Sequence, residues 1–283
     1  MKPLKILAIG AAAVIAATAS VVIYSSAQTE ADIAAFQSRI ADIGATIPAV
    51  AFDAAQIADL PEPVQRYFEF VFTGPVPVFT AVQLKAEGKF RRPLTEGFND
   101  ATAEQVIAVG TPALMFSATT PVLPGVRARA YDFFAKGQME MKAKILSTLT
   151  VVDERETPEL NRISLRRWLL ESALFPQALL PGGPVTWDAI DRSSARATVT
   201  ADGLSASMVA HFDDEGRLTQ MAAEEDGDLT TPYHGSGEHV TRGDYRPVGN
   251  LMVPHTFTIS RSADGALYPF FEGRITDIRF LTE

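Results

Sequence analysis

The chain of 283 residues contains no cysteine. This absence excludes a disulfide framework, thiol catalysis, cysteine-ligated zinc and a lipidated N-terminal cysteine. The sequence also has only two tryptophans and four histidines, and its formal net charge is −9. Because an acidic protein repels phosphate backbones, we expect no nucleic-acid partner. With 47% hydrophobic and 21% charged residues, the composition is typical of a globular protein with ample material for a core.

The sequence lacks the common catalytic and phosphate-binding motifs. It contains no Gly-x-Ser-x-Gly elbow, no Gly-x-x-x-x-Gly-Lys loop and no His-Glu-x-x-His pair. Three histidines, His234, His239 and His255, lie between residues 231 and 256. If residues 232–242 form a strand, His234 and His239 face opposite sides, and Glu238 lies about 13 Å from His234. His255 falls on an apolar face, where a lone histidine is more often a hydrogen-bonded core residue than a metal ligand. We therefore expect no metal, no cofactor and no assigned catalytic residue.

One long apolar run begins the chain. Lys2 and Lys5 precede residues 6–23, an uncharged stretch about 27 Å long as a helix, which is close to the thickness of a bilayer core. The positive-inside rule keeps the lysines in the cytoplasm and places residues 30–283 outside it. Two interpretations remain. The length of the run favours an uncleaved anchor in the cytoplasmic membrane, and a signal peptide cleaved after Ala27 would instead release a periplasmic protein.

The rest of the chain divides at changes of periodicity. Residues 1–27 form the anchor or signal peptide, and residues 28–58 are expected to form a juxtamembrane helix and linker, which we interpret as a stalk. Residues 59–283 form a single domain. The juxtamembrane helix is predicted from apolar residues at helical spacing: Ile33, Phe36, Ile40 and Ile43. A second helix is predicted from an N-cap at Asp59, with Val64, Tyr67, Phe68 and Val71 on one face.

Further along, the hydrophobic period changes to two. In the stretches "VQLKAEGKF" and "QMEMKAKI", apolar and polar residues alternate, as in antiparallel strands with one solvated face. We expect five strands between residues 78 and 152, and six more after residue 190. The last three are predicted near 232–242, 250–262 and 267–281. The fold class is therefore α+β, a curved antiparallel sheet of about 11 strands, an open half-barrel, with helices on its concave face.

One glutamate is unusual in its position. A helix is predicted from Thr157, as its cap, to about Phe175, and Glu171 lies near the middle of its apolar face. A carboxylate there is costly unless it is paired. Three interpretations follow: a Glu171–Arg167 pair at the edge of the core, a polar anchor in an apolar cavity, or a general acid with a raised pKa. The third needs a second acid, for which the candidates are Asp132, Asp188 and Asp191.

Six residues form the candidate ligand-binding set, which combines two charged residues of the predicted helix with four aromatic residues: Glu171, Arg167, Trp168, Trp187, Tyr67 and Tyr131.

The sequence resembles an uncharacterised bacterial family, domain-of-unknown-function family 6544. The matching pieces, in order, are "LPEPVQRYF", "VRARAYDFFAKGQMEMK", "LRRWLLESALFPQALLPGGPVTWDAID", "SARAT" and "YPFFEGRITDIRF", which cover about residues 60–283. Glu171 is part of this pattern and the histidines are not. The resemblance implies no established activity, cofactor or ligand. The expected topology is also similar to that of bacterial lipoprotein carriers, whose curved sheets enclose an apolar cavity.

Three functions are consistent with these observations. The first is a membrane-anchored extracytoplasmic domain that binds a lipid or another apolar molecule. The second is a non-catalytic envelope module that binds a protein, with helices filling the sheet. The third is a hydrolase-type enzyme that uses Glu171. The sequence favours a non-enzymatic function. The presence or absence of an apolar cavity with Glu171 at its wall is the observation that separates these three hypotheses.

Overall fold

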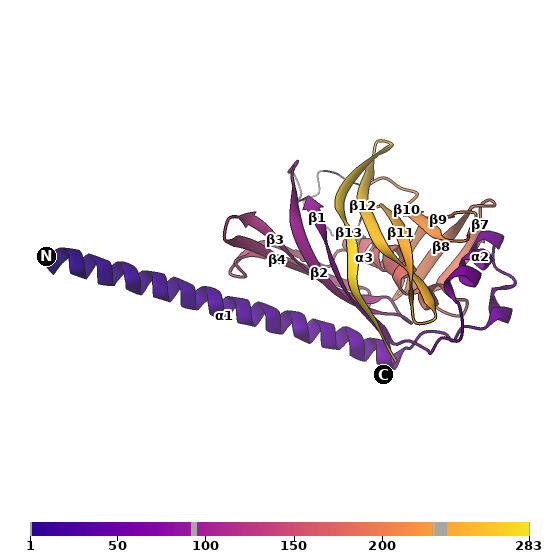
Figure 1. The fold of residues 1–283 in the computed structure, drawn as a ribbon, viewed down its shortest axis with the longest axis horizontal. Helices are drawn as coiled ribbons and strands as arrows, with labels where there is room; N and C mark the ends of the chain where they lie inside the picture. Colours follow the sequence, from indigo (N-terminus) through magenta and orange to yellow (C-terminus); the bar gives the residue numbers. More distant parts are fainter. Residues whose placement is uncertain (1, 92–94, 228, 230–236, 283) are drawn as a thin grey trace.

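The computed structural model describes residues 2–91, 95–227, 229 and 237–282. In this part of the chain, one curved sheet of 13 antiparallel strands wraps around helices, and a long N-terminal helix extends away from it (Figure 1). The sheet order is β6-β5-β4-β3-β2-β1-β13-β12-β11-β10-β9-β8-β7. The α+β class and the open antiparallel sheet are confirmed, with 13 strands where about 11 were expected.

The strands fall into two runs on either side of one helix. The first run is β1 (Ala81–Arg91), β2 (Phe98–Ala108), β3 (Ala113–Leu123), β4 (Val126–Ala135), β5 (Gln138–Ile145) and β6 (Leu149–Arg155). The second is β7 (Val185–Ala189), β8 (Ser194–Ala201), β9 (Leu204–Phe212), β10 (Leu218–Ala222), β11 (His239–Val248), β12 (Leu251–Ala263) and β13 (Ala266–Leu281). Antiparallel pairing of β1 with β13 joins the two runs into one sheet.

The strands that the sequence did not predict are β6 and β7. They are the two edges of the sheet. Each is short, and most of its residues are exposed or half-buried, so the apolar alternation that marks a buried strand is weak. The strand expected at 232–242 is corrected to His239–Val248, and residues 232–236 lie outside the described residues.

The helices are α1 (Lys2–Thr46), α2 (Glu62–Val71) and α3 (Pro158–Glu171), with 3-10 turns at Ala54–Ile57, Ser172–Leu174 and Pro176–Leu179. Thr157 caps α3 as predicted, because its Oγ1 accepts a hydrogen bond of 3.1 Å from the backbone N–H of Leu160. The predicted cap of α2 is wrong. Pro61 occupies that position, with no side-chain hydrogen bond, so Asp59 precedes the helix. The α-helical part of α3 ends at Glu171, and the chain continues as 3-10 turns.

The main core lies on the concave side of the sheet. There α2, α3 and the 3-10 turns pack against the inner face of the strands, α3 chiefly on β8 and β9 (Figure 1). The predicted apolar stripe of α2 is buried there, as are most of the side chains of α3. This placement fills the β8–β9 side of the concavity and leaves the β3–β6 side less occupied.

The long helix α1 packs on the opposite, outer face of the sheet. Ile33 and Ile40 are buried in a second hydrophobic cluster with residues of β1 to β4, such as Met115 and Phe133. Near its end the helix touches the sheet backbone, since a Cβ on Gly44 would lie 2.3 Å from the carbonyl oxygen of Thr80. This second half of α1 is therefore docked on the sheet and is not a stalk that stands clear of it.

Candidate functional site: an apolar cavity with a charged floor

A cavity of about 320 Å³ lies on the concave side of the first run of strands. Aromatic and aliphatic side chains from β1, β3, β5, β12 and β13 line it: Phe90, Phe116, Met141, Ile145, Ile259, Phe270 and Phe271. Its volume falls in the lower part of the range for small-molecule sites. The charged side chains in its lining are Asp132, Arg167 and Glu171.

Small residues on three neighbouring strands create the space. Ala118 of β3, Ala128 and Ala130 of β4, and Ala143 of β5 all line the cavity. Their even spacing places them on one face of each strand, and Ala130 pairs with both Ala118 and Ala143 in the sheet. Because α3 packs chiefly on β8 and β9, it lies to one side of this alanine wall and leaves space over it. The cavity follows from small side chains opposite an off-centre helix.

Glu171 lies at the floor of the cavity and is paired. Its Oε2 accepts a hydrogen bond of 2.6 Å from Arg242 Nη2, and its Oε1 accepts a longer one of 3.5 Å from Gln105 Nε2. The side chains of Glu171 and Arg242 are only 3% and 1% exposed. Arg242 also donates to the carbonyl oxygen of Leu170 at 3.2 Å. The expected buried carboxylate is therefore present, with its partners on strands β11 and β2.

A second ion pair lies beside the first. Arg167 donates to the carboxylate of Asp132 on β4, and its guanidinium carbon lies 4.4 Å from the centre of the Phe116 ring. Both charged residues line the cavity with Glu171. The helical wheel predicted a Glu171–Arg167 pair, but the ion pairs that form join each of these residues to a strand of the sheet. Two acids and two arginines thus balance each other at the floor.

Among the expected second acids, only Asp132 lines the cavity with Glu171. Asp188 is exposed on β7, and Asp191 is exposed in the turn that follows. Hydrogen bonds from Ser193 and Ser194 hold the pKa of the Asp191 carboxyl below its usual value.

Three of the predicted aromatic residues belong to the main core instead of the cavity lining. Trp168 is fully buried, and its indole Nε1 donates to the carbonyl oxygen of Ala108 at 2.9 Å. Trp187 donates to the carbonyl oxygen of Leu179 at 3.0 Å. Tyr67 is also fully buried, and burial raises the pKa of its phenol. Of the predicted set, the structure brings only Glu171 and Arg167 to the cavity.

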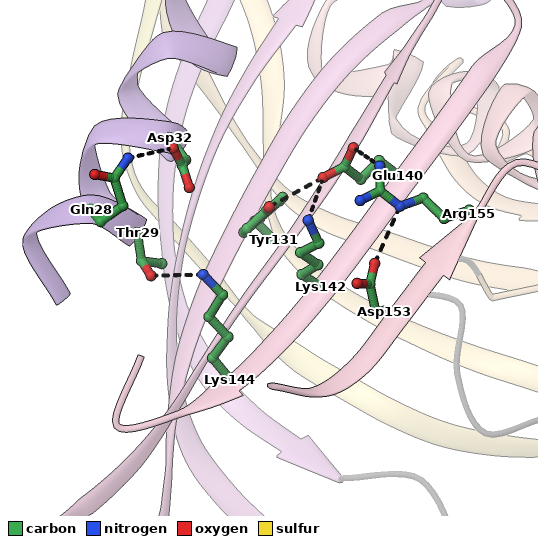
Figure 2. Close-up of polar contacts among 9 residues, drawn as sticks. All are labelled: Gln28, Thr29, Asp32, Tyr131, Glu140, Lys142, Lys144, Asp153 and Arg155. Atoms are coloured by element: carbon green, nitrogen blue, oxygen red, sulfur yellow. Dashed lines mark hydrogen bonds and ion pairs between the residues drawn. The ribbon is translucent and has the colours of Figure 1, made fainter. Parts of the chain in front are cut away.

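Tyr131 lies on the outer face of β4, beneath α1 (Figure 2). Its hydroxyl donates to Glu140 Oε1 at 3.3 Å, and Glu140 forms ion pairs with Lys142 at 3.2 Å and Arg155 at 2.7 Å. Burial, together with the charge of Glu140, raises the pKa of the Tyr131 phenol. Because successive residues of a strand face opposite sides, Tyr131 is separated by the sheet from Asp132 and the cavity.

The histidines are placed differently from one another. Nδ1 of His255 lies 2.9 Å from the carbonyl oxygen of Val253, which is the hydrogen-bonded state expected of it. His239 begins β11, where burial and the nearby His211 lower its pKa. His234 lies outside the described residues. Within the described ranges, no group of three His, Asp or Glu residues is arranged to hold a metal ion.

Sequence reasoning missed Arg242 and Gln105, which are the hydrogen-bond partners of Glu171. They are 71 and 66 residues from Glu171 along the chain, so no local periodicity connects them. A signal for the cavity itself was present, because the inner face of β3 to β5 carries alanines where a filled core needs larger side chains.

The chain belongs to a family of unknown function, DUF6920, whose model matches residues 58–280. The expected family number, 6544, is thus not the one found, although the matched stretch is nearly the one expected. Two solved structures of low similarity were also found. A porin-like protein from Bacteroides uniformis is 7% identical, with a TM-score of 0.27, over 72% of this chain and 98% of its own.

The other is a β-barrel-like protein of domain-of-unknown-function family 1849 from Brucella abortus. It is 10% identical, with a TM-score of 0.26, over 71% of this chain and 97% of its own. Both TM-scores are too low to carry an argument about function or detailed fold. No curated protein matches the chain. The expected similarity to lipoprotein carriers is not confirmed by these comparisons.

Proposed function

We propose that this domain binds a lipid chain or another apolar molecule in the cavity while α1 anchors it to the cytoplasmic membrane on the extracytoplasmic side. The observation that carries the proposal is an unfilled, largely apolar cavity of about 320 Å³ whose floor holds buried, paired charges. An alanine wall that leaves such a space loses packing contacts, and larger side chains there would fill the space and stabilise the fold. Selection for stability alone would therefore favour the larger side chains. A bound apolar molecule would restore the lost contacts.

The floor suits the polar end of such a ligand. Its ion pairs are balanced in charge, so a ligand needs no net charge to enter. Glu171 and Asp132 offer acceptor oxygens, while Arg167 carries donors. An apolar chain along the alanine wall with a polar group at the floor is the arrangement that this chemistry favours.

The N-terminal helix supports the membrane location. α1 is the one helix in the described residues that is long and apolar enough to cross a membrane, with a mean hydropathy of 1.9 in its most apolar window and none of that window buried. A signal sequence would pass the same test. An anchor is favoured because α1 continues as an unbroken helix through Ala27, where a cleaved peptide would end.

Extraction of bound lipid tests this proposal. The full chain is purified in mild detergent, washed and analysed by mass spectrometry. We expect an apolar molecule in near-stoichiometric amount with the wild type and at least a fivefold loss with Ala130→Phe, which fills the alanine wall. Ala266→Phe, an exposed position in the first residues of β13, is the matched control and should retain it. Equal recovery from all three proteins, or none from any, would overturn the proposal.

A further inference from the structure

Exposed aliphatic side chains gather at the tips of two adjacent hairpins. Leu123 is 64% exposed at the end of β3, while Leu146, Leu149 and Val151 are 39%, 62% and 51% exposed in the β5–β6 hairpin. We call these four residues the rim. An exposed leucine alone needs no explanation, but a cluster of them at hairpin tips indicates contact with an apolar partner.

The rim is one structural unit and lies beside the open end of the cavity. The two hairpins are joined by a hydrogen bond of 2.9 Å from the backbone N–H of Leu146 to the carbonyl oxygen of Arg127. Val151 lines the cavity itself, together with Val122 and Ile145 from the ends of β3 and β5. The cavity thus extends from the buried charges at its floor to these half-exposed and exposed residues. A molecule that enters here passes the rim.

Contacts with α1 fix the rim at one level of the helix. Thr29 donates to the carbonyl oxygen of Ser147 at 3.4 Å. It also accepts a hydrogen bond of 3.1 Å from Lys144 Nζ (Figure 2). One residue further, Glu30 receives two hydrogen bonds of 2.8 Å from Arg129 of β4. These contacts tie both hairpins to one turn of the helix.

That level corresponds to the surface of a bilayer. Thr29 is six residues beyond Ile23, the end of the apolar run, and six residues of helix span about 9 Å. The headgroup region on each side of a bilayer is about 5–8 Å thick. The β3–β4 hairpin points along α1 in the direction of the N-terminus of the helix (Figure 1). A membrane around residues 6–23 therefore places Thr29 at the outer limit of the headgroups, and the hairpins that contact this turn of the helix at the membrane surface.

The turn that presents Leu146 is conformationally unfavourable. Leu146 and Ser147 have φ of 51° and 55°, in the left-handed region, and the N–H of Thr148 donates to the carbonyl oxygen of Ile145. A two-residue turn of this kind normally carries Asn-Gly. A leucine here is both exposed and strained, which neither turn formation nor core packing explains.

We propose that the rim docks on the outer surface of the membrane that holds α1, so that the mouth of the cavity opens onto its lipids. The docking stands on the rim, on its fixed level on the helix and on the membrane position of α1 given in the proposed function. The statement that lipid passes through the mouth rests on the proposed function. The partner is a lipid surface because the same chain that carries the rim also carries the apolar helix beside it.

Depth-dependent fluorescence quenching tests the docking. Because the chain has no cysteine, Leu149→Cys and Leu123→Cys can each be labelled specifically with an environment-sensitive dye. Ile190→Cys is the matched control, an aliphatic residue that is 45% exposed directly after β7, at the opposite edge of the sheet. The full chain is placed in nanodiscs of phosphatidylcholine and phosphatidylglycerol, with or without lipids that carry a nitroxide near the headgroup.

We expect quenching at Leu149 and Leu123 to exceed that at Ile190 at least threefold. Quenching at the rim that is no stronger than at Ile190 would overturn the docking, whatever the cavity holds. Lipid recovery in detergent, where no bilayer exists, reports the cavity alone. Strong quenching without recovered lipid therefore supports the docking and rejects the cavity as a lipid site. Recovered lipid without quenching supports the cavity as a lipid site and rejects the docking.

Discussion

At the scale of residues, the buried pair of Glu171 and Arg242 decides what the cavity floor can do. Removing two charges from water costs several kcal/mol per ion, which their attraction and further hydrogen bonds must offset. Here Glu171 has two donors and Arg242 has an additional carbonyl acceptor. Such a pair adds little net stability, so its retention beside an apolar cavity is consistent with a role in holding a polar group.

A double-mutant cycle measures this pair. We expect Glu171→Leu and Arg242→Met each to lower the free energy of unfolding by about 3 kcal/mol, because each leaves a buried charge without its partner. The double variant Glu171→Leu with Arg242→Met should cost far less than the sum of the two single changes. Denaturant unfolding of the full chain in mild detergent gives these values. Additive costs would show that the two side chains act independently.

The sequence could predict the depth of this residue but not its partner. The position of Glu171 on the apolar face of α3 follows from about 100° of rotation per residue, a purely local property. The choice between Arg167 on the same helix and Arg242 on β11 depends on how the sheet curves around the helix. Because a helical wheel contains no information about the sheet, it also could not show that Arg167 pairs with Asp132 of β4.

At the scale of elements, the alternation of apolar and polar residues predicted those strands that have one buried face and one solvent-exposed face. It worked for β1 and β5, whose outer faces carry lysines and glutamates. It failed at the two edge strands, where neither face is well buried. Stretches such as Val106 to Ala108 and Ala113 to Met115 are buried at consecutive positions, because the main core covers one face and α1 the other. Unbroken apolar runs in an otherwise alternating sheet were a sign that α1 docks there.

In the β5–β6 turn, glycine substitutions at two nearby positions should have different effects on the free energy of unfolding. Leu146→Gly should leave the free energy of unfolding unchanged or raise it by about 0.5–1 kcal/mol, because glycine adopts the left-handed region without strain. Leu149→Gly should lower it by a similar amount, since Leu149 begins the strand β6, where glycine costs backbone entropy.

Thermal unfolding of the two variants and the wild type, with secondary structure followed by circular dichroism, checks this prediction. Similar destabilisation by both substitutions would mean that Leu146 contributes packing that its exposure does not suggest. The turn would then be explained by stability alone, and the strain would lose its value as a sign of function.

At the scale of the whole molecule, the sheet separates two hydrophobic clusters with different tasks. The inner cluster holds the helices and the cavity, and the outer cluster holds α1 against β1 to β4. The domain is thereby oriented relative to the helix by side chains that do not take part in the main core. Phe36 lies at the centre of this attachment, with its ring 4.5 Å from that of Phe133 and 5.6 Å from that of Tyr131.

The separation predicts that the attachment can be broken without unfolding the core. Phe36→Asp removes these ring contacts and places a half-buried carboxylate among apolar side chains, which is costly, so residues 29–46 of α1 should leave the sheet. We expect amide hydrogen exchange to become at least tenfold faster in this segment, while the buried Trp168 of the main core keeps its native fluorescence. Ala35→Asp, on the exposed side of the same helical turn, is the charge-matched control and should change neither property.

In nanodiscs, Phe36→Asp should also reduce the quenching of a dye at Leu149, because the rim is no longer held at the level of Thr29. Loss of the native Trp168 signal together with helix release would mean instead that the two clusters form one cooperative unit, and that α1 is part of the fold rather than the device that orients it.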